Sequence, residues 1–275
     1  MSATRIALAL GGRLEPRPRA APSPRAIALR IAPPLCLGVV VVLVWQGYVA
    51  ISGVRESIFP SPLEVASALG RDSGVLVSAA WTTLSEILLG YAAAIAVGVA
   101  LAVAVSSSRL IERALYPWLV VTQMIPIPAI APVVVLWTGF DIRPRVIVIA
   151  LVSFFPIAVN TIDGLRATDT ELLGLLRTLG AGRRQLFRVA RLPTALPYLF
   201  SGLRVSAALA VIGAVFAEWV GASSGLGFLI LSYSSQTETA DVFATIAVLA
   251  VIGVALFAAV GIAERVVIPW WQLED

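Results

Sequence analysis

The sequence predicts an all-α membrane protein with about six transmembrane helices. Hydrophobic residues make up 59% of the 275 residues and charged residues only 13%, about half of the roughly 25% that soluble domains carry. A soluble domain of this length would need a much larger polar surface. Apolar segments long enough to cross a bilayer recur along the chain, and short polar segments containing Arg separate them. Together these observations predict a bundle of membrane-spanning helices.

The first 30 residues predict a disordered, basic cytoplasmic tail. Residues 1–30 are polar and rich in Pro and Arg. Their apolar patch at 6–10 is shorter than a signal-peptide core of roughly 7–15 residues, and Arg-rich sequence follows it instead of a cleavage site. The rest of the chain, 31–275, is then a single transmembrane domain.

Six apolar segments within 31–275 predict the membrane spans, because a helix needs about 20 residues to cross the hydrocarbon. These segments are 31–51, 79–105, 116–140, 146–162, 198–220 and 242–260. Between the first two, residues 61–69 predict a short helix with Ser61 as its cap and Pro62 near its start. In the second span, Gly90 and Gly98 predict close packing against a neighbouring helix.

The placement of Arg predicts the orientation of the chain. All twenty basic residues are Arg, and an excess of basic residues marks the cytoplasmic segments of a membrane protein. With the N-terminus inside, sixteen Arg fall in cytoplasmic segments, and the four outside are Arg55, Arg71, Arg143 and Arg145. Both termini and the segment 163–197 are therefore predicted to be cytoplasmic.

Residue usage argues against enzymatic chemistry in this chain. The sequence has no His, no Lys and a single cysteine, Cys36, so it offers no usual metal site or general base. Without Lys it also has no phosphate-binding loop of the kind that binds ATP. The Arg residues lie in short runs between apolar segments, a placement that favours membrane lipid as a partner over nucleic acid.

The longest polar segment between spans predicts an amphipathic helix, a break at Gly180 and a second, basic helix over 183–191. Thr168 and Thr170 are candidate caps of the first helix, and Glu171 lies in its first turn. Its apolar residues recur at helical spacing: Leu172, Leu175, Leu176 and Leu179. An alternative interpretation is a membrane-surface hairpin whose Arg residues contact anionic lipid.

Several separated motifs point to one family. After the run Leu179-Gly180-Ala181 come Leu192-Pro193 and Leu196-Pro197-Tyr198. Other motifs are spread over 60–270: Phe59-Pro60-Ser61-Pro62, the prolines of 126–132, Phe155-Pro156, Ser201-Gly202-Leu203-Arg204, Ala217-Glu218 and Gly225-Leu226-Gly227. In this order they resemble bacterial ATP-binding-cassette importer permeases of the nitrate/sulfonate/taurine branch. The family's Glu-Ala-Ala triplet, six residues before the Gly, is replaced here by Gly174-Leu175-Leu176.

The resemblance implies a type I importer permease in the bacterial inner membrane, with a cytoplasmic coupling helix and no cofactor of its own. It implies ATPase subunits that bind ATP and Mg, a second permease copy or a sister permease, and an extracytoplasmic substrate-binding protein. Transport, not catalysis, would be the role of this chain. The residues that it assigns to ATPase coupling are Glu171, Leu175, Leu176, Arg177, Leu179, Gly180, Ala181, Leu192 and Pro193.

The third predicted span carries three prolines, which should leave backbone carbonyls unpaired. Such a break is tolerated in a membrane where it is buried in protein or lines a water-filled cavity, although a simple packing kink is an alternative. The candidates for the translocation path are Gln123, Met124, Pro126, Pro128, Trp137, Phe155, Asn160 and Glu218. Glu218, within a family motif, is a candidate for gating or packing, whereas Glu86 is expected to be solvated at the interface.

The solute is predicted from two observations. Arg is absent from the middle of the spans, and the aromatic and amide side chains near the break suit a flat heterocycle. Residues 122–126 and 155–165 also look most like permeases for thiamine-pyrimidine precursors or riboflavin. Taurine, alkanesulfonates and nitrate are alternative cargoes. A gradient-driven secondary transporter is a further alternative, but the mid-span regions lack ionisable residues for ion coupling.

Overall fold

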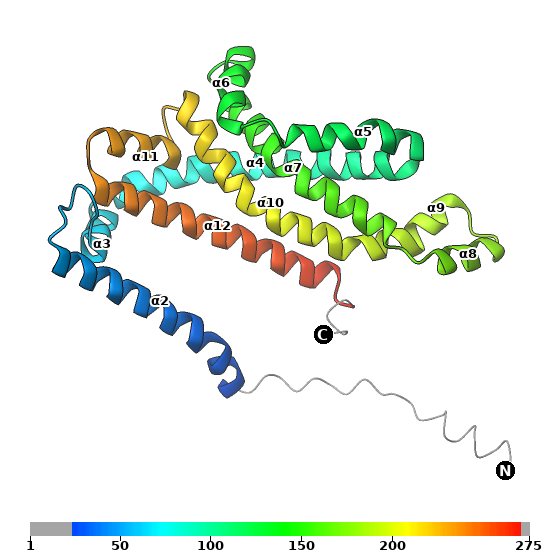
Figure 1. The fold of residues 1–275 in the computed structure, drawn as a ribbon, viewed down its shortest axis with the longest axis horizontal. Helices are drawn as coiled ribbons and strands as arrows, with labels where there is room; N and C mark the ends of the chain where they lie inside the picture. Colours follow the sequence, from blue (N-terminus) through cyan, green and yellow to red (C-terminus); the bar gives the residue numbers. More distant parts are fainter. Residues whose placement is uncertain (1–23, 271–275) are drawn as a thin grey trace, which may run out of the picture. The chain divides into compact units, whose positions relative to one another are not determined.

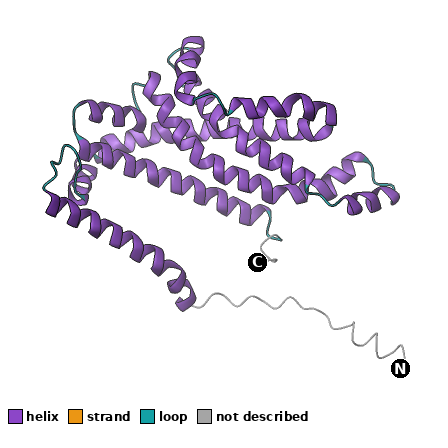
Figure 2. Ribbon diagram, viewed as in Figure 1, coloured by secondary structure: helices purple, strands orange, loops and turns teal. Residues whose placement is uncertain are grey.

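The computed structural model describes residues 24–270, which form helices joined by loops, with no strand in that range (Figures 1 and 2). Its contacts divide the chain into two units, Met1–Gly53 and Val54–Asp275. In the first unit, α2 (Pro24–Ser52) contains the apolar stretch Ala32–Ser52, which is long enough to cross a membrane. Residues 24–30 of the predicted tail thus belong to a helix, and its residues 1–23 lie outside the described part.

The second unit is built from ten α-helices and one π-helical turn within the described residues. In chain order they are α3 (Pro62–Arg71), α4 (Ser73–Ser107), α5 (Arg109–Thr122), α6 (Ile127–Thr138), α7 (Arg143–Arg166), α8 (Thr170–Thr178), α9 (Arg183–Leu186), the π turn η1 (Phe187–Arg191), α10 (Leu192–Gly221), α11 (Leu226–Ser235) and α12 (Thr239–Val267). The short helix predicted over 61–69 is α3, and Ser61 and Glu64 cap it reciprocally.

Five apolar helices of the described chain are long enough to span a membrane, and a sixth span is possible through a bent pair. The five are the Ala32–Ser52 stretch, α4, α7, the continuous stretch Arg183–Gly221 and α12. The bent pair is α5 with α6. The prediction of about six spans is therefore confirmed. The third span, however, is not the single helix over 116–140 that hydropathy suggests.

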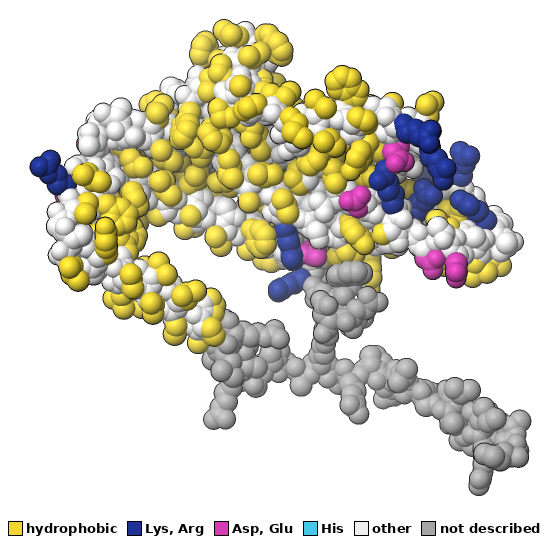
Figure 3. Space-filling view, viewed as in Figure 1, with side chains coloured by type: hydrophobic (Ala, Val, Ile, Leu, Met, Phe, Trp, Pro, Cys, Tyr) yellow, Lys and Arg dark blue, Asp and Glu magenta, His cyan; other side chains and the backbone are white. Residues whose placement is uncertain are grey.

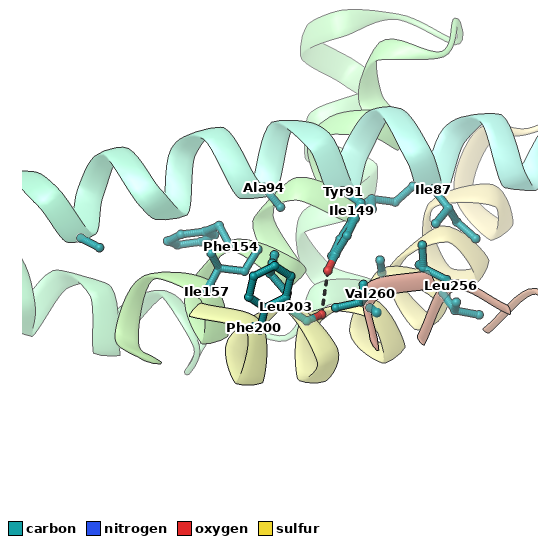
Figure 4. Close-up of a cluster of buried hydrophobic side chains, with 14 of the residues drawn as sticks. Ile87, Tyr91, Ala94, Ile149, Phe154, Ile157, Phe200, Leu203, Leu256 and Val260 are labelled. Atoms are coloured by element: carbon teal, nitrogen blue, oxygen red, sulfur yellow. Dashed lines mark hydrogen bonds between the residues drawn. The ribbon is translucent and has the colours of Figure 1, made fainter. Parts of the chain in front are cut away.

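The core of the second unit lies between α4, α7 and α10 (Figure 4). Ile87 from α4 and Ile149 and Ile157 from α7 are completely buried in it. The hydroxyl of Tyr91 donates a 2.7 Å hydrogen bond to the carbonyl oxygen of Leu203, the dashed line in Figure 4. This bond ties α4 to α10 across the core and satisfies the only polar atom of the Tyr91 side chain.

Two glycines let α4 approach α7 closely. A Cβ atom at Gly90 would lie 2.5 Å from Cβ of Ile149, and one at Gly98 would lie 2.9 Å from the carbonyl oxygen of Phe154. Neither separation leaves room for a side chain. The prediction that these small residues allow close helix packing is confirmed.

Alternating helix directions give the second unit two ends. The α11 end carries the start of α4, the start of α7, the end of α10 and α11. Hydrogen bonds from Thr83 and Gly227 to Glu218 join α4, α10 and α11 there, and the ion pair of Arg145 with Glu86 joins α7 to α4. The opposite α8 end carries the end of α4, the start of α5, the end of α7, α8 and α9. There Arg166 of α7 pairs with Glu112 of α5 at 2.6 Å.

At the α11 end, α3 is held against the start of α12. The guanidinium of Arg71 donates a 2.5 Å hydrogen bond to Asp241, and this contact raises the pKa of Arg71 above its ordinary value. The hydroxyl of Thr239 donates to the carbonyl oxygen of Ser57 at 2.6 Å. The loop before α3 is therefore anchored to the last span.

Candidate functional site

The proline-rich span breaks completely instead of kinking. α5 ends at Thr122 and α6 begins at Ile127, and the two helices meet at an angle of 100°. Pro126 is the non-helical N-cap residue just before α6, and Pro128 lies in the first turn of α6, where a missing N–H is tolerated. Because neither proline has an N–H, the carbonyls of Thr122 and Met124 lose the donors that a continuous helix would supply.

A cavity of about 320 Å³ lies at this break, within the size range of small-molecule sites. Its lining comes from the break itself, from α6, and from the facing sides of α7 and α10. The lining residues are Thr122, Gln123, Ile125, Pro126, Ile127, Ile130, Val148, Leu151, Val152 and Leu209. None of them is charged, so the walls are apolar and the polar groups are gathered at the break.

Of the eight predicted path residues, the described structure places two, Gln123 and Pro126, in the lining of this cavity. Met124 lies in the same break but is 74% exposed, and Pro128 and Trp137 of α6 are also exposed; none of the three lines the cavity. The apolar walls from α7 and α10 were missed by sequence reasoning. Val148, Val152 and Leu209 read as ordinary spanning residues, and only tertiary packing brings them to the break.

Phe155 and Asn160 serve the packing of α7 against α10. Phe155 is half-buried against the main core. The amide of Asn160 donates to the carbonyl of Pro156 at 2.8 Å. A Cβ atom at Gly202 of α10 would lie only 2.6 Å from that carbonyl oxygen, so the two backbones are in close contact there. Neither side chain lines the cavity.

Glu218 caps the N-terminus of α11 from within the membrane domain. Its carboxylate accepts hydrogen bonds from the backbone N–H of Gly227 at 2.5 Å and of Phe228 at 3.3 Å. Thr83 of α4 donates to the same carboxylate at 2.6 Å and accepts from the N–H of Leu226 at 2.8 Å. A carboxylate at a helix N-terminus satisfies free N–H groups and the helix dipole. Of the two roles considered for Glu218, this geometry favours packing.

The conformation of Gly225 depends on this cap. Its φ is +114°, in the region that favours glycine, and a Cβ atom there would collide with the carboxylate of Glu218. The motifs Ala217-Glu218 and Gly225-Leu226-Gly227 therefore form one structural unit, although six residues lie between Glu218 and Gly225 in the chain.

Glu86 is buried, so the expectation that it is solvated at the interface is wrong. Only 1% of the residue is exposed, because α7 covers it and supplies Arg145 as an ion-pair partner. Arg145 also donates to the carbonyl oxygen of Asp141 at 3.3 to 3.4 Å. The second carboxylate oxygen of Glu86 has no hydrogen-bond partner among the described residues, and the carboxyl group of Glu218 lies close enough to interact with Glu86. Glu86 and Arg145 thus form a buried charge pair near the α11 end.

A second charge pair involves Arg204, which lies inside the apolar stretch Arg183–Gly221. Its guanidinium pairs with Glu264 of α12 and lies 5.8 Å from the ring centre of Phe257. The charge of Arg204 is therefore compensated. Neither Arg145 nor Arg204 lines the cavity.

The α8 hairpin, residues 169–191, has the predicted helix–Gly–helix form with a different cap. Asp169, not Thr168 or Thr170, is the N-cap of α8, and its side chain accepts from the N–H of Glu171 at 2.8 Å. Gly180 ends the hairpin's first helix with φ +85°. The N–H of Gly180 donates to the carbonyl oxygen of Arg177 at 2.9 Å, and the N–H of Ala181 donates to the carbonyl oxygen of Leu176 at 3.0 Å. These two bonds form a Schellman motif.

The α8 hairpin has one packed face and one open face. Leu173, Leu186 and Ala190 are buried together, with Leu176 and Ala181 packed against them. In contrast, Leu175 is 58% and Leu179 74% exposed, and Glu171, Arg177 and Gly180 are also exposed. The predicted basic helix over 183–191 is α9 followed by the π turn η1, and Leu192 and Pro193 open α10.

A family model described as the binding-protein-dependent transport system inner membrane component matches residues 94–271. The chain belongs to this family. As an inner membrane component it is a multi-pass membrane protein and the permease subunit of an ATP-binding-cassette importer, with ATP hydrolysis in a separate subunit. This membership confirms the family recognised from the motifs and rules out the gradient-driven alternative.

Two relatives and one solved structure are similar over most of their length. The formylaminopyrimidine transport permease ThiX of Halalkalibacterium halodurans is 36% identical, over 86% of this chain and 95% of its own. The riboflavin transport system permease RibX of Chloroflexus aurantiacus is also 36% identical, over 93% and 97%. The inward-facing MetNI methionine ABC transporter is 20% identical with a TM-score of 0.62, over 70% of this chain and 96% of that one. The last match confirms the type I importer fold.

Proposed function

We propose that this permease carries a small, uncharged, flat heterocycle of the thiamine-pyrimidine-precursor or riboflavin class. The observation that carries the proposal is the cavity at the α5–α6 break, whose lining contains no charged residue. Its apolar walls suit a ring system, and the Gln123 amide and the backbone carbonyls freed by Pro126 and Pro128 suit the hydrogen-bonding edge of such a ring. The names of the two relatives support the same class of solute.

An anionic cargo fits this lining less well. A sulfonate or nitrate that leaves water needs cationic or hydrogen-bonding partners to offset its desolvation. The guanidinium groups of Arg145, whose side chain is 13% exposed, and of Arg204, whose side chain is 40% exposed, are already paired with carboxylates. Taurine, alkanesulfonates and nitrate are therefore the competing outcomes of the transport test below.

The rest of the proposed assembly follows from the open face of the α8 hairpin. A separate ATPase subunit, which holds ATP and Mg, docks on α8 through the exposed side chains of Leu175 and Leu179 beside the Gly180 turn. Residues Glu171, Leu175, Leu176, Arg177, Leu179, Gly180, Ala181, Leu192 and Pro193 form or support this contact. A second permease, either a copy of this chain or a sister, completes the pathway, and an extracytoplasmic binding protein delivers the solute.

The proposed orientation places both termini and the α8 end in the cytoplasm. It is supported by the Arg count of the sequence: with Arg204 left out because it lies within α10, fifteen Arg fall in cytoplasmic segments against four outside. The α11 end, with Glu218 and the start of α12, then faces the binding protein.

A tryptophan that fills the cavity should block transport of the proposed solute. Leu209→Trp places a larger ring between α7 and α10, and we expect uptake of a radiolabelled pyrimidine precursor or riboflavin to fall about tenfold or more, because overpacked cavities exclude their ligands. Leu136→Trp is the matched control, since Leu136 is 81% exposed on α6 and outside the lining. Proteoliposomes that hold the whole complex and its binding protein give the measurement.

Two outcomes would contradict the proposal. Uptake of taurine, alkanesulfonate or nitrate, with none of the heterocycles, would contradict the cargo. Full uptake by Leu209→Trp would show that the cavity does not lie on the path.

A further inference from the structure

A second cavity, of about 450 Å³, lies at the α8 end between the end of α4, the end of α7 and the α8 hairpin. It is separate from the α5–α6 break and shares none of its residues. The lining residues are Val103, Ser106, Ser107, Leu165, Arg177, Arg183, Leu186, Phe187 and Arg191. We call it the arginine pocket.

The three guanidinium groups of the arginine pocket are uncompensated. Arg177, Arg183 and Arg191 make no ion pair with any described residue, and no carboxylate belongs to the lining. Figure 3 shows Arg side chains gathered at this end of the molecule, with a smaller number of acidic side chains beside them. By contrast, Arg166, at the same end, has Glu112 as its partner at 2.6 Å. A pocket with three unpaired cations favours an anion.

The other side of the arginine pocket is apolar. Val103, Leu165, Leu186 and Phe187 supply it, and Leu186 is itself buried in the small core of the hairpin. The hydroxyl of Ser106 is buried and has no partner in the described structure, so a donor is available beside the cations. The pocket therefore offers hydrogen bonds and positive charge to an anionic group, and apolar contact to a hydrocarbon attached to it.

The π turn η1 arranges this lining. Arg183, Phe187 and Arg191 follow one another at intervals of four residues. In a regular α-helix, positions four apart drift steadily around the axis. The wider π turn over Phe187–Arg191 holds more residues per turn and offsets that drift. All three side chains consequently line the same pocket. In chain order, the Phe187 ring comes between the guanidinium groups of Arg183 and Arg191.

We propose that the arginine pocket binds the phosphate headgroup of an anionic phospholipid, with the start of its acyl chain on the apolar side. Phospholipid is favoured over a free phosphate anion because the pocket joins cations to an apolar wall at the end of two membrane-spanning helices. That the lipid comes from the inner leaflet rests on the orientation in the proposed function. A lipid in this position contacts both α4 and α8, so it stabilises the placement of the α8 hairpin.

The test compares two charge-matched double variants of the full chain, purified with its ATPase. Arg183→Gln/Arg191→Gln removes two pocket cations, and Arg184→Gln/Arg188→Gln removes two exposed cations from the same segment that do not line the pocket. Binding of dioctanoyl phosphatidylglycerol is measured in neutral detergent by native mass spectrometry. Phosphatidylcholine with the same chains, glycerol 3-phosphate and inorganic phosphate are the comparison probes.

We expect wild type and the Arg184→Gln/Arg188→Gln variant to bind phosphatidylglycerol alike, and the pocket variant to bind it about tenfold more weakly or worse, as the loss of two charges predicts. Equal losses in both variants would show a diffuse surface effect and overturn the pocket. Equally tight binding of phosphate or glycerol 3-phosphate would overturn the lipid. Loss of the ATPase from the pocket variant, with unchanged lipid binding, would assign these Arg residues to the ATPase interface instead.

The result of the lipid-binding test does not depend on which solute the permease transports. A permease that transports none of the proposed heterocycles, yet loses phosphatidylglycerol only in the pocket variant, would refute the proposed function and leave the lipid site standing. A transporting permease whose pocket variant binds lipid normally would refute the lipid site alone.

Discussion

A Gly180→Val variant is expected to insert and fold but to lose most of its ATP-coupled transport, by about tenfold or more. Gly180 has φ +85°, a conformation that costs a β-branched residue about 1–2 kcal/mol or more. A Cβ atom at this position would meet no atom within 4 Å, so the strain comes from the backbone and not from a collision. Relief of that strain breaks the bonds from Gly180 and Ala181 that end α8, and moves Leu179 out of its place.

Gly180→Asn is the matched control, because Asn adopts positive φ far more readily than Val. We expect it to keep most of the transport. Uptake and ATPase activity are measured together in proteoliposomes, where uncoupling appears as ATP hydrolysis that the solute no longer stimulates. Wild-type uptake by Gly180→Val, or equal losses in both variants, would be incompatible with a coupling role for this turn.

An Arg145→Gln variant should be strongly destabilised, by about 3–5 kcal/mol, because it leaves a buried charge without its partner. Only 1% of Glu86 is exposed, and 13% of the Arg145 side chain. The amide of Gln cannot replace the guanidinium charge, so Glu86 must either stay unpaired or take up a proton. The consequence is a large fall in the thermal unfolding midpoint of the purified protein.

Two further variants test the cause of that loss. Glu86→Gln/Arg145→Gln removes both charges and should recover most of the lost stability, as neutral replacements of buried pairs often do. Arg143→Gln, two residues away with a side chain 76% exposed, should change stability by no more than about 0.5 kcal/mol. A stable Arg145→Gln protein, or a double variant no better than the single one, would argue against an energetically important pair.

Hydropathy predicted the spans well because lipid imposes one strong rule, about 20 apolar residues for each crossing. The same rule wrongly predicted one continuous span over residues 116–140. The average apolar character of this segment is that of a single span, whereas Pro126 and Pro128 break the helix, so that α6 lies at 100° to α5. Hydropathy weighs side chains and takes no account of a missing backbone N–H. The Gly180 turn was predictable because its cause is local, a C-cap with positive φ after an amphipathic helix.

The buried polar contacts could not be predicted, because their partners are distant in sequence. Glu86 and Arg145 lie 59 residues apart, and Thr83 and Glu218 135 apart. From the sequence alone, Glu86 near a span end and a solvated interfacial Glu look identical. The cavity walls from α7 and α10 could not be predicted from the sequence either. As residues of apolar spans, Val148 and Leu209 are indistinguishable from lipid-facing residues until the packing of the helices is known.

We propose that this chain transports only with the energy of a separate ATPase that docks on the α8 hairpin. The most direct test is to tag the chain, isolate it gently from its native membrane, and identify the proteins that come with it. We expect a stoichiometric ATP-binding-cassette subunit to purify with the chain, and we expect the Gly180→Asn variant to retain it. A stable chain that purifies alone, without any ATPase, would contradict the proposal.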